Sequence, residues 1–352
     1  MPFSRRHAVI LVAATTLILY LVRSIDYGSP ASWGRFRVPG SVAERPSYTA
    51  AIVYLASVLP GPRDPAKLLA SLPLIQKNIP WRHQWPVLLL HAGAYDSYEN
   101  QVDFLDRLRG SAQGQNLTPD ATEKLVNRIE FVHTDHDLPA GIPADGGSDG
   151  PIWDREWPAY HHVCAFFSYK IFSHPRIKDL TYYFRLDDDS HVREPTCFDP
   201  FEYMHVHNKS YAFRREDPDL GWVTEGMWPL VSNYAQRHPE VESTLDRNGW
   251  EWPPNRFWPN NFGQGQNFPS YETNFDLVKV PRFRTPEMTA FLHELASDPK
   301  RFYWNRWGDA PLRLAQVYMF LDVAEEVHEL CEIPYSHKDQ VWDDCACVPL
   351  PD

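Results

Sequence analysis

Four short apolar runs, widely spaced along the chain, place the strongest constraint on its fold. They cover residues 49–56, 86–91, 129–133 and 181–186. Strands that are covered on both faces read as continuous apolar segments of this kind. A helix is expected between the first two runs, where Asp64 is a good N-cap and Pro65 a good first helical residue. The pattern predicts an α/β fold with a mostly parallel sheet.

Composition and charge narrow the class of protein. The chain has 352 residues, of which 43% are hydrophobic and 23% charged, so it can bury the core of one large or two modest domains. Asp and Glu number 46 against 34 for Lys and Arg, which gives a net charge of −12. Such a charge repels a nucleic-acid backbone, and general nucleic-acid binding is not expected. A phosphate ligand would need a metal ion or a local basic pocket.

The N-terminus carries an apolar run from Ala8 to Val22. As a helix these residues span about 22 Å, short of the roughly 30 Å hydrocarbon core of a bilayer. A signal peptide and a short uncleaved anchor both fit, and the bulky residues that follow the run favour the anchor. The predicted organisation is a cytoplasmic tail (1–7), a signal anchor (8–22), a stem (23–47) and a folded domain (48–352).

Five cysteines are too few and too scattered for a disulfide scaffold. One or two disulfides would suit an oxidising compartment. The odd number leaves at least one thiol free, or bonded to another chain.

Three later segments have helical character. Apolar residues recur at helical spacing from Tyr160 to Phe172 and form one face. Two more helices are expected to begin near Pro286 and Pro311.

The fourth apolar run ends abruptly in three carboxylates, Asp187, Asp188 and Asp189. The carboxyl edge of a parallel sheet is where α/β proteins bind ligands. Alternate residues of an extended segment face the same way, so Asp187 and Asp189 can converge. Two hard oxygen ligands suit Mg²⁺ or Mn²⁺, and such an ion can hold a diphosphate. The alternative is a solvated turn at the end of a strand.

Five motifs stand out along the chain: Tyr160–Ser168, Tyr183–Asp189, Asn274-Phe275-Asp276, Arg306–Pro311 and Ile333–His337. Together they resemble a known family, the fungal Golgi α-1,2-mannosyltransferases of glycosyltransferase family 15. They occur in the order and approximate spacing of that family, and the resemblance covers roughly residues 48–340.

The resemblance implies a GT-A-like, Rossmann-related fold with a mixed, mostly parallel sheet flanked by helices. It implies a single-pass type II Golgi membrane protein whose catalytic domain is lumenal. It also implies an Mn²⁺-dependent retaining transfer of mannose from GDP-mannose to a mannosylated glycan or glycoprotein. The product would be an N- or O-linked mannoprotein glycan, such as those of the cell wall.

The resemblance also suggests the metal ligands. Asp187 takes the position of a metal-binding Glu of the family but is one methylene shorter, so Asp189 is expected to share the ion. His337 matches the family's second ligand. Imidazole together with carboxylate favours Mn²⁺ over Mg²⁺.

Two further residues match family positions at the nucleotide. Tyr160 corresponds to a tyrosine near the nucleotide, and Arg185 to an arginine that pairs with the diphosphate, a role suited to its planar guanidinium. His161 and Ser57 stand at or near positions where the family has arginines. These two losses of positive charge weaken the prediction of the donor.

Three carboxylates match the reacting and acceptor side of the family site. Asp276 corresponds to a Glu that acts as nucleophile or oxocarbenium stabiliser, so both double displacement and front-face return stay open. Asp309 corresponds to a carboxylate near the acceptor, and taken alone it could cap the helix that Pro311 begins. Asp219 lies roughly where the family has another acceptor-side Glu.

Two other functions compete with this interpretation. The first is a transferase of the same fold with a different donor or linkage, which the changed metal motif and the two lost arginines favour. The second is a non-catalytic member that binds glycans. The three adjacent aspartates argue against the second, because a decayed site has no reason to keep mutually repelling charges together.

Overall fold

The computed structural model describes residues 46–61, 64–146, 157–252, 267–343 and 345–347. The predicted tail and anchor, and nearly all of the predicted stem, lie outside these residues. Among the residues that are described, no helix has both the length and the apolar character needed to cross a bilayer.

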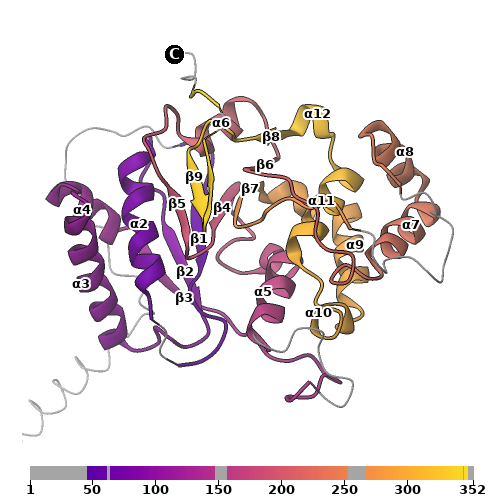
Figure 1. Cartoon of the computed structure of the whole chain (residues 1–352), viewed down its shortest axis with the longest axis horizontal. Helices are drawn as coiled ribbons and strands as arrows, with labels where there is room; N and C mark the ends of the chain where they lie inside the picture. The colour runs from indigo at the N-terminus through magenta and orange to yellow at the C-terminus, as the bar shows by residue number, and fades with distance from the viewer. Residues whose placement is uncertain (1–45, 62–63, 147–156, 253–266, 344, 348–352) are drawn as a thin grey trace, which may run out of the picture. The chain divides into compact units, whose positions relative to one another are not determined.

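A seven-stranded mixed sheet forms the centre of the described body (Figure 1). Four neighbouring strands run parallel, the fifth runs antiparallel between its neighbours, and the last two are parallel to each other. The predicted mostly parallel sheet is therefore confirmed. In sheet order its strands are β3 (Ile129–His133), β2 (Val87–His91), β1 (Ala50–Leu55), β4 (Tyr182–Leu186), β7 (Phe275–Lys279), β6 (Tyr211–Phe213) and β8 (Val327–Glu329).

Helices cover both faces of this sheet, and alternate strand residues enter two separate cores. In β1, Ala51 and Val53 enter one core, while Ile52 and Tyr54 enter the other. The core of Ile52 is closed by α2 (Ala66–Asn78), α3 (Tyr98–Gly114), α4 (Pro119–Val126) and α6 (Pro200–Val206). The core of Val53 is closed by α5 (Ala159–Ser168), α7 (Met227–Arg237), α8 (Pro239–Arg247), α9 (Pro286–Ala296), α10 (Lys300–Tyr303) and α11 (Asp309–Phe320).

Directly after the acidic triplet, the chain enters a second, three-stranded antiparallel sheet. Its order is β10 (Gln340–Trp342), β9 (Tyr335–His337) and β5 (Ser190–Val192). Ser190 pairs with His337 in this ladder. The pairing brings a histidine from near the end of the chain beside the carboxylates that follow β4.

The predicted helices form, with differences at their ends. Helix α2 begins at Ala66, and the Asp64 carboxylate accepts the Ala66 N–H at 3.1 Å. The helical stretch predicted from Tyr160 to Phe172 is interrupted at Tyr169, whose φ of −148° is not helical, and a 3₁₀ turn (η2, Lys170–Ser173) follows. The remaining short elements are η3 (Val280–Arg284) and α12 (Val323–Glu326).

Two disulfides hold the C-terminal segment to the body. Cys197 bonds to Cys347 and Cys331 bonds to Cys345, while the thiol of Cys164 is buried and unbonded. This pairing agrees with the expectation of one or two disulfides and one free thiol.

The two disulfides are expected to differ in their contribution to stability. In the loop-closure model, a bond across 150 residues adds about 5 kcal/mol and one across 14 residues about 3 kcal/mol. We therefore expect Cys347→Ser to lower the free energy of unfolding more than Cys345→Ser, as measured by denaturant titration. An equal loss, or the reverse order, would contradict the loop-closure account of these bonds.

Candidate active site

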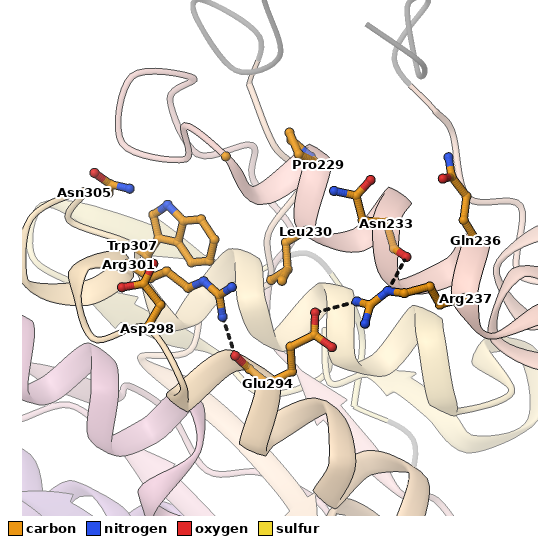
Figure 2. A pocket seen from close by; sticks show the side chains of 11 residues that line it. Pro229, Leu230, Asn233, Gln236, Arg237, Glu294, Asp298, Arg301, Asn305 and Trp307 are labelled. Carbon is orange, nitrogen blue, oxygen red and sulfur yellow. Dashed lines mark hydrogen bonds and ion pairs between the residues drawn. The ribbon is translucent and has the colours of Figure 1, made fainter. Parts of the chain in front are cut away.

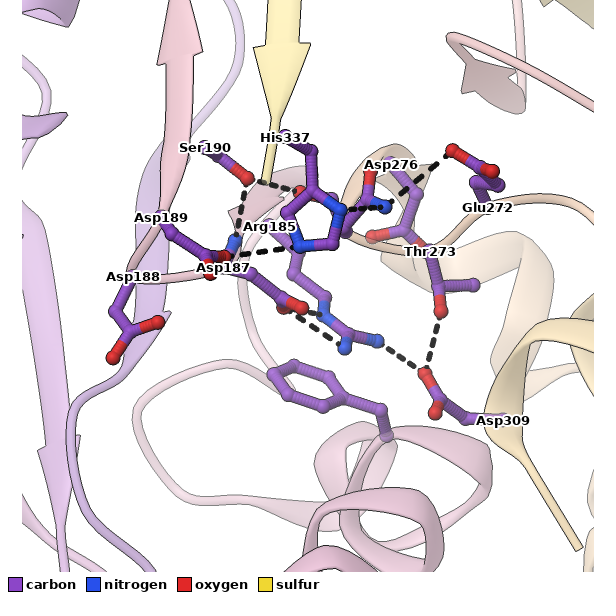
Figure 3. Close-up of polar contacts among 12 residues, drawn as sticks. Arg185, Asp187, Asp188, Asp189, Ser190, Glu272, Thr273, Asp276, Asp309 and His337 are labelled. Carbon is purple, nitrogen blue, oxygen red and sulfur yellow. Dashed lines mark hydrogen bonds and ion pairs between the residues drawn. The ribbon is translucent and has the colours of Figure 1, made fainter. Parts of the chain in front are cut away.

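The buried guanidinium of Arg185 is the centre of the polar cluster at the end of β4 (Figure 3). Its Nε and Nη2 donate to Oδ1 of Asp187 at 3.2 and 3.0 Å, and its Nη1 donates to Asp309. One face of the guanidinium lies 3.6 Å from the centroid of the Phe167 ring on α5. These contacts hold the side chain in one orientation, only 3% exposed.

The paired charges stabilise one another. Burial alone would raise the pKa of Asp309, but Arg185 and the Thr273 hydroxyl, which donates to Asp309 at 2.7 Å, hold it below its usual value. Burial likewise disfavours the charged form of Arg185, yet Asp309 and Asp187 raise its pKa above the usual value. Arg185 and Asp309 are therefore both ionised at neutral pH.

Asp309 is not the N-cap of its helix, which corrects one reading of the sequence. Gly308 occupies the N-cap position, and Asp309 is the first residue of α11. The carboxylate sits in the first turn, where the helix dipole favours negative charge, and its side chain is directed toward Arg185 instead of capping the helix.

A second pair, Asp189 and His337, lies beside the Arg185 cluster. The carboxylate of Asp189 is 3.0 Å from Nε2 of His337, and it also accepts a hydrogen bond from Lys67 at 2.8 Å. His337, followed by Lys67, holds the pKa of Asp189 well below its usual value. Oδ1 of the intervening Asp188 lies 3.9 Å from Nζ of Lys67. Asp187 and Asp189, the first and last residues of the triplet, therefore have different partners.

The side-chain amide of Asn274 lies 3.0 Å from Nδ1 of His337. A metal bound through Nε2 would leave the proton on Nδ1, and the Asn274 amide could accept a hydrogen bond from that N–H through its oxygen if the amide group were flipped. Sequence reasoning missed this contact of Asn274, although the residue belongs to the Asn274-Phe275-Asp276 motif and precedes β7.

The donor set at His337 fits a divalent cation in part. Asp189 and His337 offer an oxygen and a nitrogen side by side, whereas Oδ1 of Asp187 accepts hydrogen bonds from Arg185. Within the part of the chain that the structure describes, Asp187, Asp189 and His337 do not form a cluster of three mutually close donor atoms. The predicted ligands are therefore brought to one place, with two of them in contact.

Asp276 lies behind Arg185 and is fully buried. It is the cross-strand neighbour of Arg185, and its Oδ2 is 3.4 Å from Nε of Arg313. Neither carboxylate oxygen has a hydrogen-bond partner among the residues that the structure describes. Burial raises the pKa of Asp276 to about 6, although Arg313 and Arg185 act in the opposite direction. In this conformation the side chain has no exposed surface.

Tyr160 and Asp219 share the neighbouring cation Arg306. The guanidinium of Arg306 is 4.5 Å from the centroid of the Tyr160 ring, and its charge opposes the rise in pKa that burial causes at Asp219. The Asp219 carboxylate also lies close to Gly308, where an added Cβ would be in ordinary van der Waals contact with its Oδ2 at 3.4 Å. Arg306, which has a φ of 42°, was missed by sequence reasoning although it begins the Arg306–Pro311 motif.

The side chains of His161 and Ser57 are buried, and both make hydrogen bonds within the fold. The His161 ring is buried, stacks on Tyr303 and hydrogen-bonds through Nδ1 to the Phe302 carbonyl. The hydroxyl of Ser57 donates to the Leu59 carbonyl at 2.6 Å. Lys67 lies beside Asp188 and Asp189, and Arg306 lies near Asp219.

A polar cavity of about 590 Å³ opens beside the Arg306–Pro311 segment (Figure 2). Trp307 forms part of its wall, and the indole N–H donates to the Glu225 carbonyl at 2.7 Å. Arg237 and Glu294, both in the wall, form an ion pair at 2.6 Å.

Replacing Asp309 tests whether the buried pair supports the fold. Removing one partner of a buried ion pair costs about 3–5 kcal/mol, so we expect Asp309→Asn to lower the free energy of unfolding by about that amount at pH 7. The folded pKa of Asp309 is depressed, so its contribution is complete above pH 3.8 and is lost as the pH falls through the folded pKa.

Denaturant titrations over this pH range measure the effect. The difference between the parent chain and Asp309→Asn should shrink below pH 3.8. The exposed Asp103→Asn on α3, whose partner Arg107 is 3.9 Å away, is the matched control and should change stability by less than about 1 kcal/mol. Equal effects of the two substitutions would show that the buried pair is not stabilising.

Comparison with known proteins places this arrangement in a family. The family model for glycolipid 2-alpha-mannosyltransferase matches residues 149–349, more than half of the chain. The O-glycoside alpha-1,2-mannosyltransferase omh1 of Schizosaccharomyces pombe is 30% identical over 56% of this chain and 50% of its own length. The probable mannosyltransferase KTR4 of Saccharomyces cerevisiae is 27% identical over 55% of this chain and 41% of its own length. The chain spans about half the length of the curated relatives it matches.

Two solved structures share the fold. The mannosyltransferase Ktr4p of S. cerevisiae, in complex with GDP, aligns over 84% of this chain and 72% of its own, with a TM-score of 0.64 and 21% identity. Core-mannan synthase A of Aspergillus fumigatus, in its Mn/GDP form, aligns over 88% and 81%, with a TM-score of 0.65 and 19% identity. These likenesses confirm the GT-A-like fold. On the strength of the family match, the chain belongs to the glycolipid 2-alpha-mannosyltransferase family, which is glycosyltransferase family 15.

Proposed function

We propose that this chain is a retaining α-1,2-mannosyltransferase that moves mannose from GDP-mannose to a mannosylated glycan or glycoprotein. The observation that carries the proposal is the contact of Asp189 with His337, 3.0 Å apart at the carboxyl end of the central strand β4. Membership of the family, and relatives named as α-1,2-mannosyltransferases, support the donor and the linkage.

Asp189 and His337 are the residues that would hold the metal, with Asp187 close by. An oxygen and an imidazole nitrogen suit Mn²⁺ better than Mg²⁺, and the Mn/GDP form of core-mannan synthase A supports the same choice. When bound, the ion would neutralise charge that develops on the leaving diphosphate. Lys67, which already donates to Asp189, adds a positive charge at the same place.

Arg185 and Tyr160 are the proposed nucleotide contacts. Arg185 keeps its charge throughout, so it can offer a diphosphate two parallel N–H donors if Asp187 gives up its hydrogen bonds. The GDP complex of Ktr4p supports a guanosine nucleotide as the donor. Asp187 is thereby proposed to keep Arg185 oriented until the donor arrives.

The buried position of Asp276 bears on how the sugar configuration is retained. A double displacement needs a carboxylate oxygen against the anomeric carbon, whereas front-face return uses the leaving phosphate to assist the incoming hydroxyl. Because both Asp276 oxygens are buried behind Arg185, we favour front-face return. Asp276 then acts as a negative charge behind Arg185, and Asp309 and Asp219 lie on the acceptor side.

We further propose that the protein is a single-pass type II Golgi membrane protein, with residues 8–22 as the anchor and the described body in the lumen. Two disulfides in that body support an oxidising compartment. Microscopy of the tagged chain, together with protease protection of residues 48–352 in sealed vesicles, tests this proposal. Digestion of the body without detergent would overturn it.

A transferase with a different sugar nucleotide is the second candidate. It is favoured by His161 and Ser57, which are turned to internal hydrogen bonds and leave the nucleotide side with fewer cations than the resemblance implies. A panel of GDP- and UDP-sugars separates the candidates. GDP-mannose should give the fastest acceptor-stimulated release of nucleotide, and faster release from any other donor would favour the second candidate.

Substitutions within the triplet test the metal assignment. We expect Asp189→Asn and His337→Ala each to weaken Mn²⁺ activation of nucleotide release at least tenfold, because each removes a ligand. Asp188→Asn is the matched control, since Asp188 points away from His337, and it should keep most of the activity. The concentration of Mn²⁺ at half-maximal rate is the measurement. Normal activation of both ligand variants would refute the assignment.

A further inference from the structure

Two neighbouring parallel strands both end in histidine. His91 is the last residue of β2 and His133 the last of β3, and the strand register places them directly opposite each other. The loop that follows β2 supplies Asp96 before helix α3 begins. Topology therefore gathers two imidazoles and a carboxylate at one corner of the sheet, and the proposed transfer reaction uses none of them.

The three side chains lie at distances close to those of a metal site. Oδ1 of Asp96 is 2.8 Å from Nδ1 of His133 and 3.8 Å from Nδ1 of His91. One potential ligand atom from each residue lies within 4.8 Å of the other two. Tetrahedral zinc with bonds of about 2.1 Å places neighbouring donors about 3.4 Å apart, so small movements would close the site.

The surroundings prepare both rings for coordination. The Nε2 of His133 is 3.3 Å from Oδ1 of Asp135, the kind of carboxylate contact that orients a metal-binding histidine. His91 is buried, and its Nδ1 accepts the backbone N–H groups of Gly93 and Tyr95 at 3.2 and 3.4 Å. Nδ1 of His91 is therefore unprotonated, and its two long hydrogen bonds are the contacts that a metal would replace.

We propose that His91, Asp96 and His133 bind one Zn²⁺ ion, with water as the fourth ligand. Two imidazoles and one carboxylate are a donor set that zinc takes readily, whereas Ca²⁺ and Mg²⁺ prefer oxygen ligands throughout. His133 and Asp96 are about half exposed, at 49% and 57%, so an ion can enter from solvent.

This site is distinct from the Asp189–His337 pair. Strands β2 and β3 are two and three positions from β4 in the sheet, which corresponds to about 10 and 15 Å at the usual spacing of strands. The ion would tie the start of helix α3 to the end of β3. We expect the bound ion to stabilise the ends of β2 and β3 against unfolding.

Calorimetric titration of the full chain with ZnCl₂, after treatment with chelator, tests the proposal. The His337→Ala variant is used so that the β4 pair lacks its nitrogen ligand. One zinc ion per chain is expected, with affinity at least tenfold lower when His133→Gln or Asp96→Asn is added. Zinc should also raise the midpoint of thermal unfolding, and this rise should disappear in both variants.

His207→Gln, which alters an exposed histidine at the end of α6, is the matched control and should bind zinc like its parent. Circular dichroism of the metal-free proteins checks that each variant folds. Absence of zinc binding would overturn the proposal and leave only an Asp96–His133 ion pair. Unchanged zinc affinity in both His133→Gln and Asp96→Asn would also overturn it.

Discussion

The buried charge of Arg185 is the constraint on which the rest of the site depends. A guanidinium that is almost wholly removed from water is tolerated only when its hydrogen bonds are satisfied by carboxylates. Asp187 supplies one partner from the end of the same strand, and Asp309 supplies the other from the first turn of α11. The pair therefore fixes how α11 meets the sheet. It also sets the end of β4, from which the chain enters β5 and pairs with His337.

Because Arg185 binds Asp187, the three carboxylates of the acidic triplet have different partners. Asp187 balances Arg185, Asp188 faces Lys67, and Asp189 meets both Lys67 and His337. Three adjacent carboxylates repel one another, and they coexist because each has its own cation or imidazole nearby. The same charges lie at the end of β4, where we have proposed that a divalent ion and a diphosphate bind.

The sequence predicts the strands and the acidic edge well, because continuous apolar runs and an abrupt polar stop are local signals. The resemblance to a family brings distant motifs together, and the structure places Arg185, Asp187, Asp189, Asp309 and His337 in one cluster. Contacts that depend on tertiary packing could not be predicted. Asn274 beside His337, Arg313 beside Asp276 and Lys67 beside Asp189 arise from strand register and helix placement, and no local pattern marks them.

The most direct test of the central claim is transfer itself. The purified chain is incubated with GDP-mannose and an α-mannoside acceptor, with Mn²⁺ or with chelator, and the product is identified by NMR. The account predicts an α-1,2-linked mannose that forms only with the metal, together with stoichiometric GDP. A β-linked product, or equal transfer in the presence of chelator, would contradict it.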